Sequence, residues 1–225
     1  GGCSGQPATA SVGRITEVGS SISRTAYAYN TAGLITSSVQ ITGGRSFAFS
    51  YGYNAAYALA SQTFPSGRNM LLEYDDAGRK KYIMGRHASI SKYYAGTSSS
   101  GIQYASHGAP SSMAMGNGVM ESRSYNSRLQ LTKIQAGALL TLWNCYQAGD
   151  DSACSSLATV SMNNGNVQGQ KVARGNQNWV QKYFYDGVNR LSAAQEINAW
   201  QQTYGYDSFG NRWVSSHSGL PLNAQ

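Results

Sequence analysis

A short aromatic motif recurs along the chain and constrains its fold more than any other feature. Two aromatic residues, separated by one position and followed by Asp or Asn, occur as Tyr27-Ala28-Tyr29-Asn30, Tyr51-Gly52-Tyr53-Asn54, Tyr183-Phe184-Tyr185-Asp186 and Tyr204-Gly205-Tyr206-Asp207. Looser copies are Leu72-Glu73-Tyr74-Asp75 and Arg123-Ser124-Tyr125-Asn126. Several copies stand about 20 residues apart, a period typical of repeat architectures whose units bury apolar surface against their neighbours.

The residues after each aromatic pair predict a tight turn. Asp or Asn stands three positions before Gly at Asn30/Gly33, Asp75/Gly78 and Asp207/Gly210. Such a side chain accepts a hydrogen bond from a backbone N–H two residues on, and Gly adopts the positive φ that closes the turn. Asn189 fits the same position after Asp186, because Asn tolerates the left-handed region. Each copy is therefore predicted to be a β-hairpin.

The flanking segments predict strands. Spacing of two places both aromatic rings of a motif on one face, where they can pack against rings of the next unit. Alternating patterns at 129–134 and 191–197 resume strands, and Gly116-Asn117-Gly118 and Asn164-Gly165 mark further turns. An isolated hairpin is only marginally stable in water. We therefore expect an all-β fold of repeated hairpins in a continuous, twisted antiparallel strip.

Composition supports this expectation. Charged residues make up 12%, about half the usual share of 25%. The 16 Tyr and 26 Gly suit strands and turns. The net charge of +7 comes from scattered residues, the densest group being Arg79-Lys80-Lys81. Solvated surface charge is the favoured interpretation, with an anion-binding face as the alternative.

Two of the three cysteines predict a disulfide. Cys145 and Cys154 close a short polar loop, an insertion at about 144–155, and should pair in an oxidising compartment. Neither belongs to a CxxC pair and the histidines are distant, which argues against zinc. Cys3 could pair between chains, anchor a lipid, or have no role.

No catalytic residue, metal ligand or cofactor-binding residue is predicted. The sequence contains no GxSxG, HExxH, Walker-type loop, or GxGxxG before a helix. Asp150-Asp151 lacks the alternating oxygen ligands of an EF-hand, so solvation is favoured over cation binding. His87, His107 and His217 have no acid nearby in sequence. We expect no enzymatic activity and no cofactor, and no apolar run is long enough to span a membrane.

The aromatic residues allow two interpretations. The motif tyrosines, with Trp143, Trp179, Trp200 and Trp213, could form the packed stripe that stacks hairpins, or an exposed platform for glycans or nucleic acid. Packing is favoured, because stacked hairpins need a buried stripe.

The motifs resemble the YD repeat of the Rhs family, whose relatives include the shell subunits of insecticidal toxin complexes and the teneurins. The best matches are Tyr185-Asp186-Gly187-Val188-Asn189-Arg190-Leu191, Tyr206-Asp207-Ser208-Phe209-Gly210-Asn211-Arg212 and Tyr74-Asp75-Asp76-Ala77-Gly78-Arg79, and the stretches 116–119 and 125–130 are also similar. The resemblance assigns an N-terminal segment 1–12, a repeat array 13–215 and a C-terminal tail 216–225. It is weakest at 89–110 and in the cysteine loop.

This resemblance implies a long β-sheet strip that spirals into a hollow cocoon, which in many relatives encloses a toxin. Complete shells need more repeats, and a closing motif for self-cleavage is not found in this sequence. We expect an excised stretch, or a short member that self-associates. The predicted function is a structural part of a bacterial extracellular or cell-surface shell, stalk or fibre. The alternatives are a module that binds surface glycan or another anionic polymer, and part of a toxin-encapsulating cocoon. The expected partners are other copies or the rest of a longer Rhs chain, with surface polysaccharide as a further candidate and no specific nucleic acid.

Overall fold

A computed structural model describes residues 11–157 and 163–219 and is built almost entirely of β-strands. The first sheet contains β1 (Glu17–Gly19), β2 (Ser23–Tyr29), β3 (Ile35–Thr42), β4 (Arg45–Tyr53), β5 (Leu59–Thr63), β6 (Asn69–Tyr74), β7 (Lys80–His87) and β8 (Ile90–Ala95). The second sheet contains β9 (Gln103–Tyr104), β10 (Pro110–Ala114), β11 (Met120–Tyr125), β12 (Leu131–Ala136), β13 (Leu140–Cys145), β14 (Gly169–Arg174), β15 (Gln177–Tyr185), β16 (Leu191–Glu196), β17 (Trp200–Tyr206) and β18 (Arg212–Ser218).

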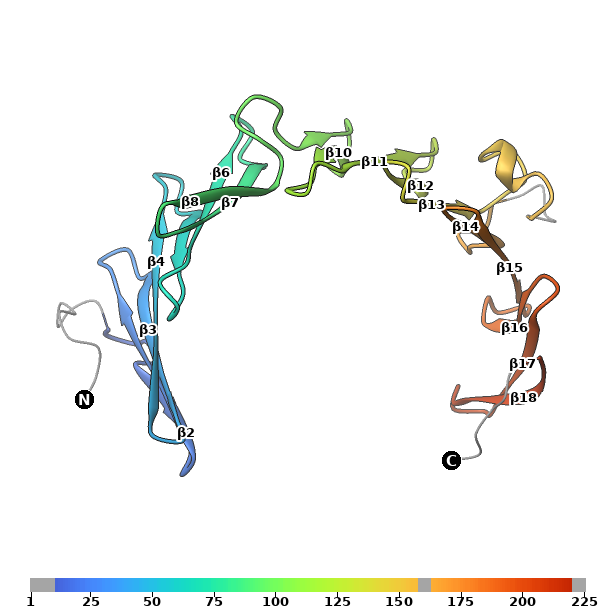
Figure 1. Cartoon of the computed structure of the whole chain (residues 1–225). Coiled ribbons are helices and arrows are strands. Elements are labelled where there is room, and N and C mark those ends of the chain that lie inside the picture. Colours follow the sequence, from blue (N-terminus) through green and yellow to red (C-terminus); the bar gives the residue numbers. More distant parts are fainter. Residues whose placement is uncertain (1–10, 158–162, 220–225) are drawn as a thin grey trace. The chain divides into compact units, whose positions relative to one another are not determined.

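Each sheet is an antiparallel meander in which strands neighbour one another in sequence order (Figure 1). The predicted repeated hairpins and all-β fold are confirmed. The strands form two sheets, of 8 and 10 strands, rather than one continuous strip. The chain correspondingly divides into two compact units, Gly1–Gln103 with Ala114–Gly118, and Tyr104–Met113 with Val119–Gln225.

The connections of each meander alternate between its two rims, because consecutive strands run in opposite directions. In the first sheet one rim carries the loops 30–34, 54–58 and 75–79. In the second sheet the corresponding rim carries the loops 105–109, 126–130, 186–190 and 207–211, together with the cysteine insertion. The Asp and Asn turns of the repeated motif thus gather along one rim of each sheet, whereas the predicted turn at Gly116-Asn117-Gly118 connects β10 to β11 on the opposite rim.

Two predicted strand boundaries were wrong: β16 ends at Glu196 rather than at Ile197, and the start of β12 also differs. The pattern at 129–134 placed Leu129 at the start of a strand, but β12 begins at Leu131 and Leu129 has a φ of 63°. Leu129 occupies the fourth position of its loop, where five of the seven similar loops have glycine, so the backbone geometry of the loop overrides the apolar pattern.

Few side chains are fully buried. Among the described residues, the buried hydrophobic ones are Ala26, Ala28, Tyr29, Leu72, Cys145, Cys154, Leu157 and Ala194. Most strand residues are half-buried, as expected for side chains that pack mainly against their neighbours on one sheet. The described residues contain one three-residue 3₁₀ helix, Ser152–Cys154, and no helix long and apolar enough to cross a membrane.

Candidate functional site

The loops share one hydrogen-bonding scheme. In the loop 186–190, the N–H of Asp186 donates to the Arg190 carbonyl (2.9 Å) and the N–H of Asn189 donates to the Asp186 carbonyl (3.0 Å). The same two bonds close the loops 30–34, 54–58, 64–68, 75–79, 105–109, 126–130 and 207–211. The fourth residue has positive φ in every case, namely Gly33, Tyr57, Gly67, Gly78, Gly108, Leu129, Asn189 and Gly210. This is the turn geometry that the motif predicted.

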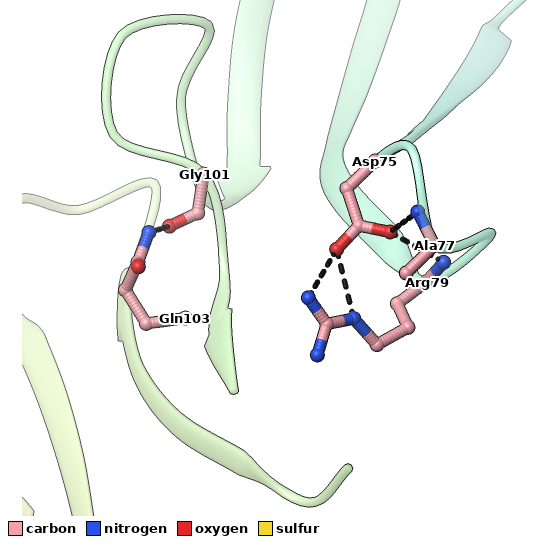
Figure 2. A network of polar contacts seen from close by, with 5 residues as sticks. All are labelled: Asp75, Ala77, Arg79, Gly101 and Gln103. Atoms are coloured by element: carbon pink, nitrogen blue, oxygen red, sulfur yellow. Dashed lines mark hydrogen bonds and ion pairs between the residues drawn. The ribbon is translucent and has the colours of Figure 1, made fainter. Parts of the chain in front are cut away.

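In six of these eight loops the first residue is Asp or Asn, and its side chain caps the loop. Asp75 Oδ1 accepts hydrogen bonds from the backbone N–H of Ala77 (3.0 Å) and of Arg79 (2.8 Å), and Oδ2 accepts one from Nε of Arg79 (2.8 Å; Figure 2). The backbone N–H of Arg79, followed by its guanidinium, lowers the pKa of the Asp75 carboxyl. Both carboxylate oxygens are therefore occupied in shaping the loop.

Two further loops repeat this arrangement. Asp186 accepts from Val188 N (3.0 Å), Arg190 N (2.8 Å) and Arg190 Nε (2.7 Å). Asp207 accepts from Phe209 N (2.9 Å), Asn211 N (2.9 Å) and Asn211 Nδ2 (2.8 Å). The pKa of Asp186 is lowered mainly by the backbone N–H of Arg190, and that of Asp207 mainly by the side-chain amide of Asn211.

The second tyrosine of each motif joins successive repeats. Its hydroxyl donates to a main-chain carbonyl 14 to 18 positions earlier in the chain. These inter-repeat hydrogen bonds are Tyr29 to Ile15 (2.6 Å) and, each at 2.8 Å, Tyr53 to Ile35, Tyr74 to Leu59, Tyr125 to Pro110, Tyr185 to Val167 and Tyr206 to Leu191. Each repeat is thereby fastened to the one before it.

The strand register explains why these carbonyls accept a hydroxyl. Ile35 is the first residue of β3 and pairs with Tyr29 of its own hairpin. The ladder between β3 and β4 begins two residues later, at Ser37 and Ser50. The carbonyl of Ile35 therefore lies beyond the ladder between β3 and β4, and the Tyr53 hydroxyl supplies a donor to this partly buried carbonyl.

The sequence predicted stacking of these rings but not the bonds of their hydroxyls. A signal was present, since the second position of the motif is Tyr in all six copies, whereas the first is Tyr, Leu or Arg. Two first-position hydroxyls bond locally, from Tyr183 to Gln181 (2.6 Å) and from Tyr204 to Gln202 (2.8 Å), whereas the Tyr51 hydroxyl shares a hydrogen bond with the Ser38 hydroxyl (3.1 Å). Burial raises the pKa of Tyr185 and of Tyr53.

Arginines add a second link between repeats. The guanidinium carbon of Arg190 lies 4.3 Å from the ring centroid of Tyr206, whose hydroxyl bonds to the residue after Arg190. Arg14 lies over the Tyr29 ring in the same relation, at 5.7 Å. Within one hairpin, Arg212 of β18 likewise lies 4.7 Å from the ring of Tyr204 in β17. Such contacts favour arginine beside the motif tyrosines.

The cysteine insertion is held by a disulfide. Cys145, the last residue of β13, bonds to Cys154 with a Cα–Cα distance of 5.3 Å. Both are fully buried and pack with Leu157 and Val180. Cys3 lies outside the described residues.

The acidic pair of the insertion acts in capping. Asp150 accepts from the backbone N–H of Tyr146 (2.7 Å) and from the Asn126 amide (3.2 Å). Asp151 accepts from the backbone N–H of Ala153 (2.9 Å), which caps the 3₁₀ helix. Within the described ranges, no three His, Cys, Asp or Glu side chains lie close enough to hold a metal ion.

The histidines and tryptophans are dispersed. His87 bonds to the Ser66 carbonyl at 3.1 Å, His107 contacts the Tyr125 ring edge-on at 4.6 Å, and His217 lies on the exposed β18. Trp143, Trp179 and Trp200 are half-buried, whereas Trp213 is 51% exposed. The tryptophans therefore do not form one buried stripe.

Comparison with known proteins identifies the fold. No protein-family model and no curated protein matches the chain. Among solved structures, TcdB2-TccC3 with Cdc42 matches over 95% of this chain (TM-score 0.73), and TcdB2-TccC3 without its hypervariable C-terminal region over 91% (0.71). The Photorhabdus luminescens Tc holotoxin pore matches over 92% (0.70). Identity is 17% in each case, and the chain spans only 12% of the length of each of these chains.

The likeness shows that this chain has the fold of part of a toxin-complex chain. It agrees with the Rhs-type resemblance that the repeated motifs indicated. The hairpins, the capped loops and the inter-repeat hydrogen bonds describe how this sequence makes that fold.

Proposed function

We propose that the chain is a non-catalytic structural segment of an extracellular β-sheet shell. The observation that carries this proposal is the series of inter-repeat hydrogen bonds, in which a tyrosine hydroxyl links each of the six motif hairpins to the segment before it. The motif residues are engaged in this linkage and in loop capping, which suits a scaffold that extends by repetition.

The toxin-complex likeness supports the proposed partners, and the disulfide supports the proposed extracellular location. A segment with the fold of TcdB2-TccC3 chains would associate with other parts of a longer Rhs-type chain or with further copies, and the finer hypothesis is a cocoon that encloses a toxin. Disulfides persist mainly in oxidising compartments, so the buried Cys145–Cys154 pair supports an extracellular or cell-surface location.

Light scattering and negative-stain electron microscopy of the purified chain test this role. Ordered rings or fibres of stacked sheets would support a self-assembling shell, and a discrete folded monomer would support a segment of a longer shell. A chain that unfolds without cooperativity would contradict the proposal, as would turnover in a hydrolase screen.

A further inference from the structure

One face of the second sheet gathers half of the lysines of the chain. Backbone pairing places Lys133, Trp143, Lys171 and Val180 in one row across β12 to β15. Directly paired residues share a face of the sheet. Lys182 lies on that face too, because it follows Val180 by two positions on β15. We define Lys133, Trp143, Lys171 and Lys182 as the lysine face.

Trp143 holds two of these ammonium groups in place. Nζ of Lys133 lies 5.4 Å from the Trp143 ring centroid, and Nζ of Lys171 lies 5.3 Å from it. The two lysines come from the strands on either side of β13, each about 4.8 Å away. Attraction between a cation and the ring favours these positions, so both charges are organised before any ligand arrives.

Acidic residues of the strands lie on the opposite face. Glu121 pairs with Ala136, which lies three positions after Lys133 on β12 and so faces the other way. Glu196 pairs with Gln181, which precedes Lys182 on β15 and also faces the other way. In the described part of the chain, the ion pairs join arginines to acids and none includes a residue of the lysine face. The positive charge of this face is therefore not neutralised by a neighbouring carboxylate.

Amide and hydroxyl side chains complete the face. Gln135 pairs with Thr141 two positions along from the Lys133–Trp143 pair, and Gln195 pairs with Lys182. The cysteine insertion packs on one end of this face, because Val180 packs with Cys145, Cys154 and Leu157, and a side chain at Gly169 would meet Leu157 at 2.8 Å. Ammonium groups thus stand among groups that can bond to sugar hydroxyls and carboxylates.

We propose that the lysine face binds a linear polysaccharide that carries carboxylate groups. Single-stranded nucleic acid is disfavoured because its bases stack on open aromatic faces, whereas two lysines occupy the Trp143 ring. Arginine, which binds phosphate through two parallel bonds, does not contribute from the neighbouring strands, since Arg123 and Arg174 alternate onto the opposite face. This binding goes beyond the structural role and does not depend on it.

The test is titration of the full chain with polygalacturonate, with neutral dextran and single-stranded DNA as comparison ligands. The variant is Lys133→Gln with Lys171→Gln. The matched control is Lys80→Gln with Lys92→Gln, which removes the same charge from exposed positions in the first sheet. We expect wild type and control to bind polygalacturonate equally and the variant to bind on the order of fivefold more weakly. Added salt should weaken binding.

Three outcomes would overturn the proposal. They are absence of polygalacturonate binding at low salt, equal weakening in the control, and tighter binding of single-stranded DNA. Thermal unfolding of each variant verifies folding. Lys182→Gln, which lies outside the Lys133–Trp143–Lys171 row, provides a second variant that should also weaken binding. Loss of ordered assemblies in the microscope would count against the shell role alone and would leave this binding measurement intact.

Discussion

The second sheet closes two strand pairs on the same rim by different means. Between β15 and β16, the loop 186–190 is shaped by hydrogen bonds to Asp186. Between β13 and β14 the chain makes a longer excursion, which the buried Cys145–Cys154 disulfide holds at its base. One connection is local and polar, and the other is covalent and packed.

Both connections are nevertheless followed by a carbonyl that accepts the same kind of inter-repeat hydrogen bond. The Leu191 carbonyl, after the loop, accepts from Tyr206 at 2.8 Å, and the Val167 carbonyl, after the insertion, accepts from Tyr185 at 2.8 Å. The repeat therefore depends on where the acceptor carbonyl lies and tolerates different paths to it. A long insertion in a surface connection costs little loop-closure entropy, which agrees with this tolerance.

Among changes to the two connections, removal of the disulfide should have the largest effect on stability. Cys145→Ala with Cys154→Ala should lower the free energy of unfolding by about 2–3 kcal/mol, because the crosslink restricts the unfolded chain. Denaturant unfolding measures the loss. Reducing agent should produce a similar shift in wild type and none in the variant. If both the double variant and the reduced wild type lost little stability, the packing of the insertion, rather than the crosslink, would stabilise this connection.

Loss of one inter-repeat hydroxyl should have the next largest effect. Tyr206→Phe leaves the Leu191 carbonyl without its donor and should cost about 1 kcal/mol in the free energy of unfolding. Tyr185→Phe should cost a similar amount if the insertion truly restores the acceptor position. Tyr57→Phe, at a 64% exposed side chain, is the control and should be near neutral. A cost at Tyr206 but not at Tyr185 would mean that the two connections are not equivalent.

The difference between the connections also shows what the sequence could predict. The loop at Asp186 and Asn189 was predictable because its bonds span four residues. The partner of Tyr206 was not, since it depends on where the ladder between β16 and β17 begins. The lysine face likewise depends on the register of several strands. Nothing in the local patterns placed the break between the two sheets.

Removal of a loop cap should cost less than loss of a tyrosine hydroxyl. The loops 64–68 and 105–109 keep the shared backbone bonds although Phe64 and Ala105 stand in the first position. Asp186→Ala should therefore lower stability only slightly, as measured by denaturant unfolding. The reciprocal change, Ala105→Asp, should raise it slightly. An Asp186→Ala cost larger than that of Tyr206→Phe would show that capping, rather than the link between repeats, dominates this rim.

The pH dependence of the free energy of unfolding should also distinguish the two connections, and we expect this effect to be the smallest of those considered. Hydrogen bonds lower the pKa of Asp186 and of Asp207 in the folded chain, first through the backbone N–H of Arg190 and the side-chain amide of Asn211, respectively. A carboxyl whose pKa is lowered by folding stabilises the fold above its unfolded pKa of about 4, and this contribution disappears as pH falls through the folded pKa. The disulfide has no corresponding titration.

The free energy of unfolding should consequently decline below about pH 4 in wild type. It should decline less in Asp186→Asn with Asp207→Asn, because asparagine supplies the same oxygen without titrating. Asn54 already caps its loop in this way, accepting from Ala56 and Ala58 at 3.0 and 2.9 Å. Equal acid slopes in the two proteins would assign the acid sensitivity to carboxylates outside these loops.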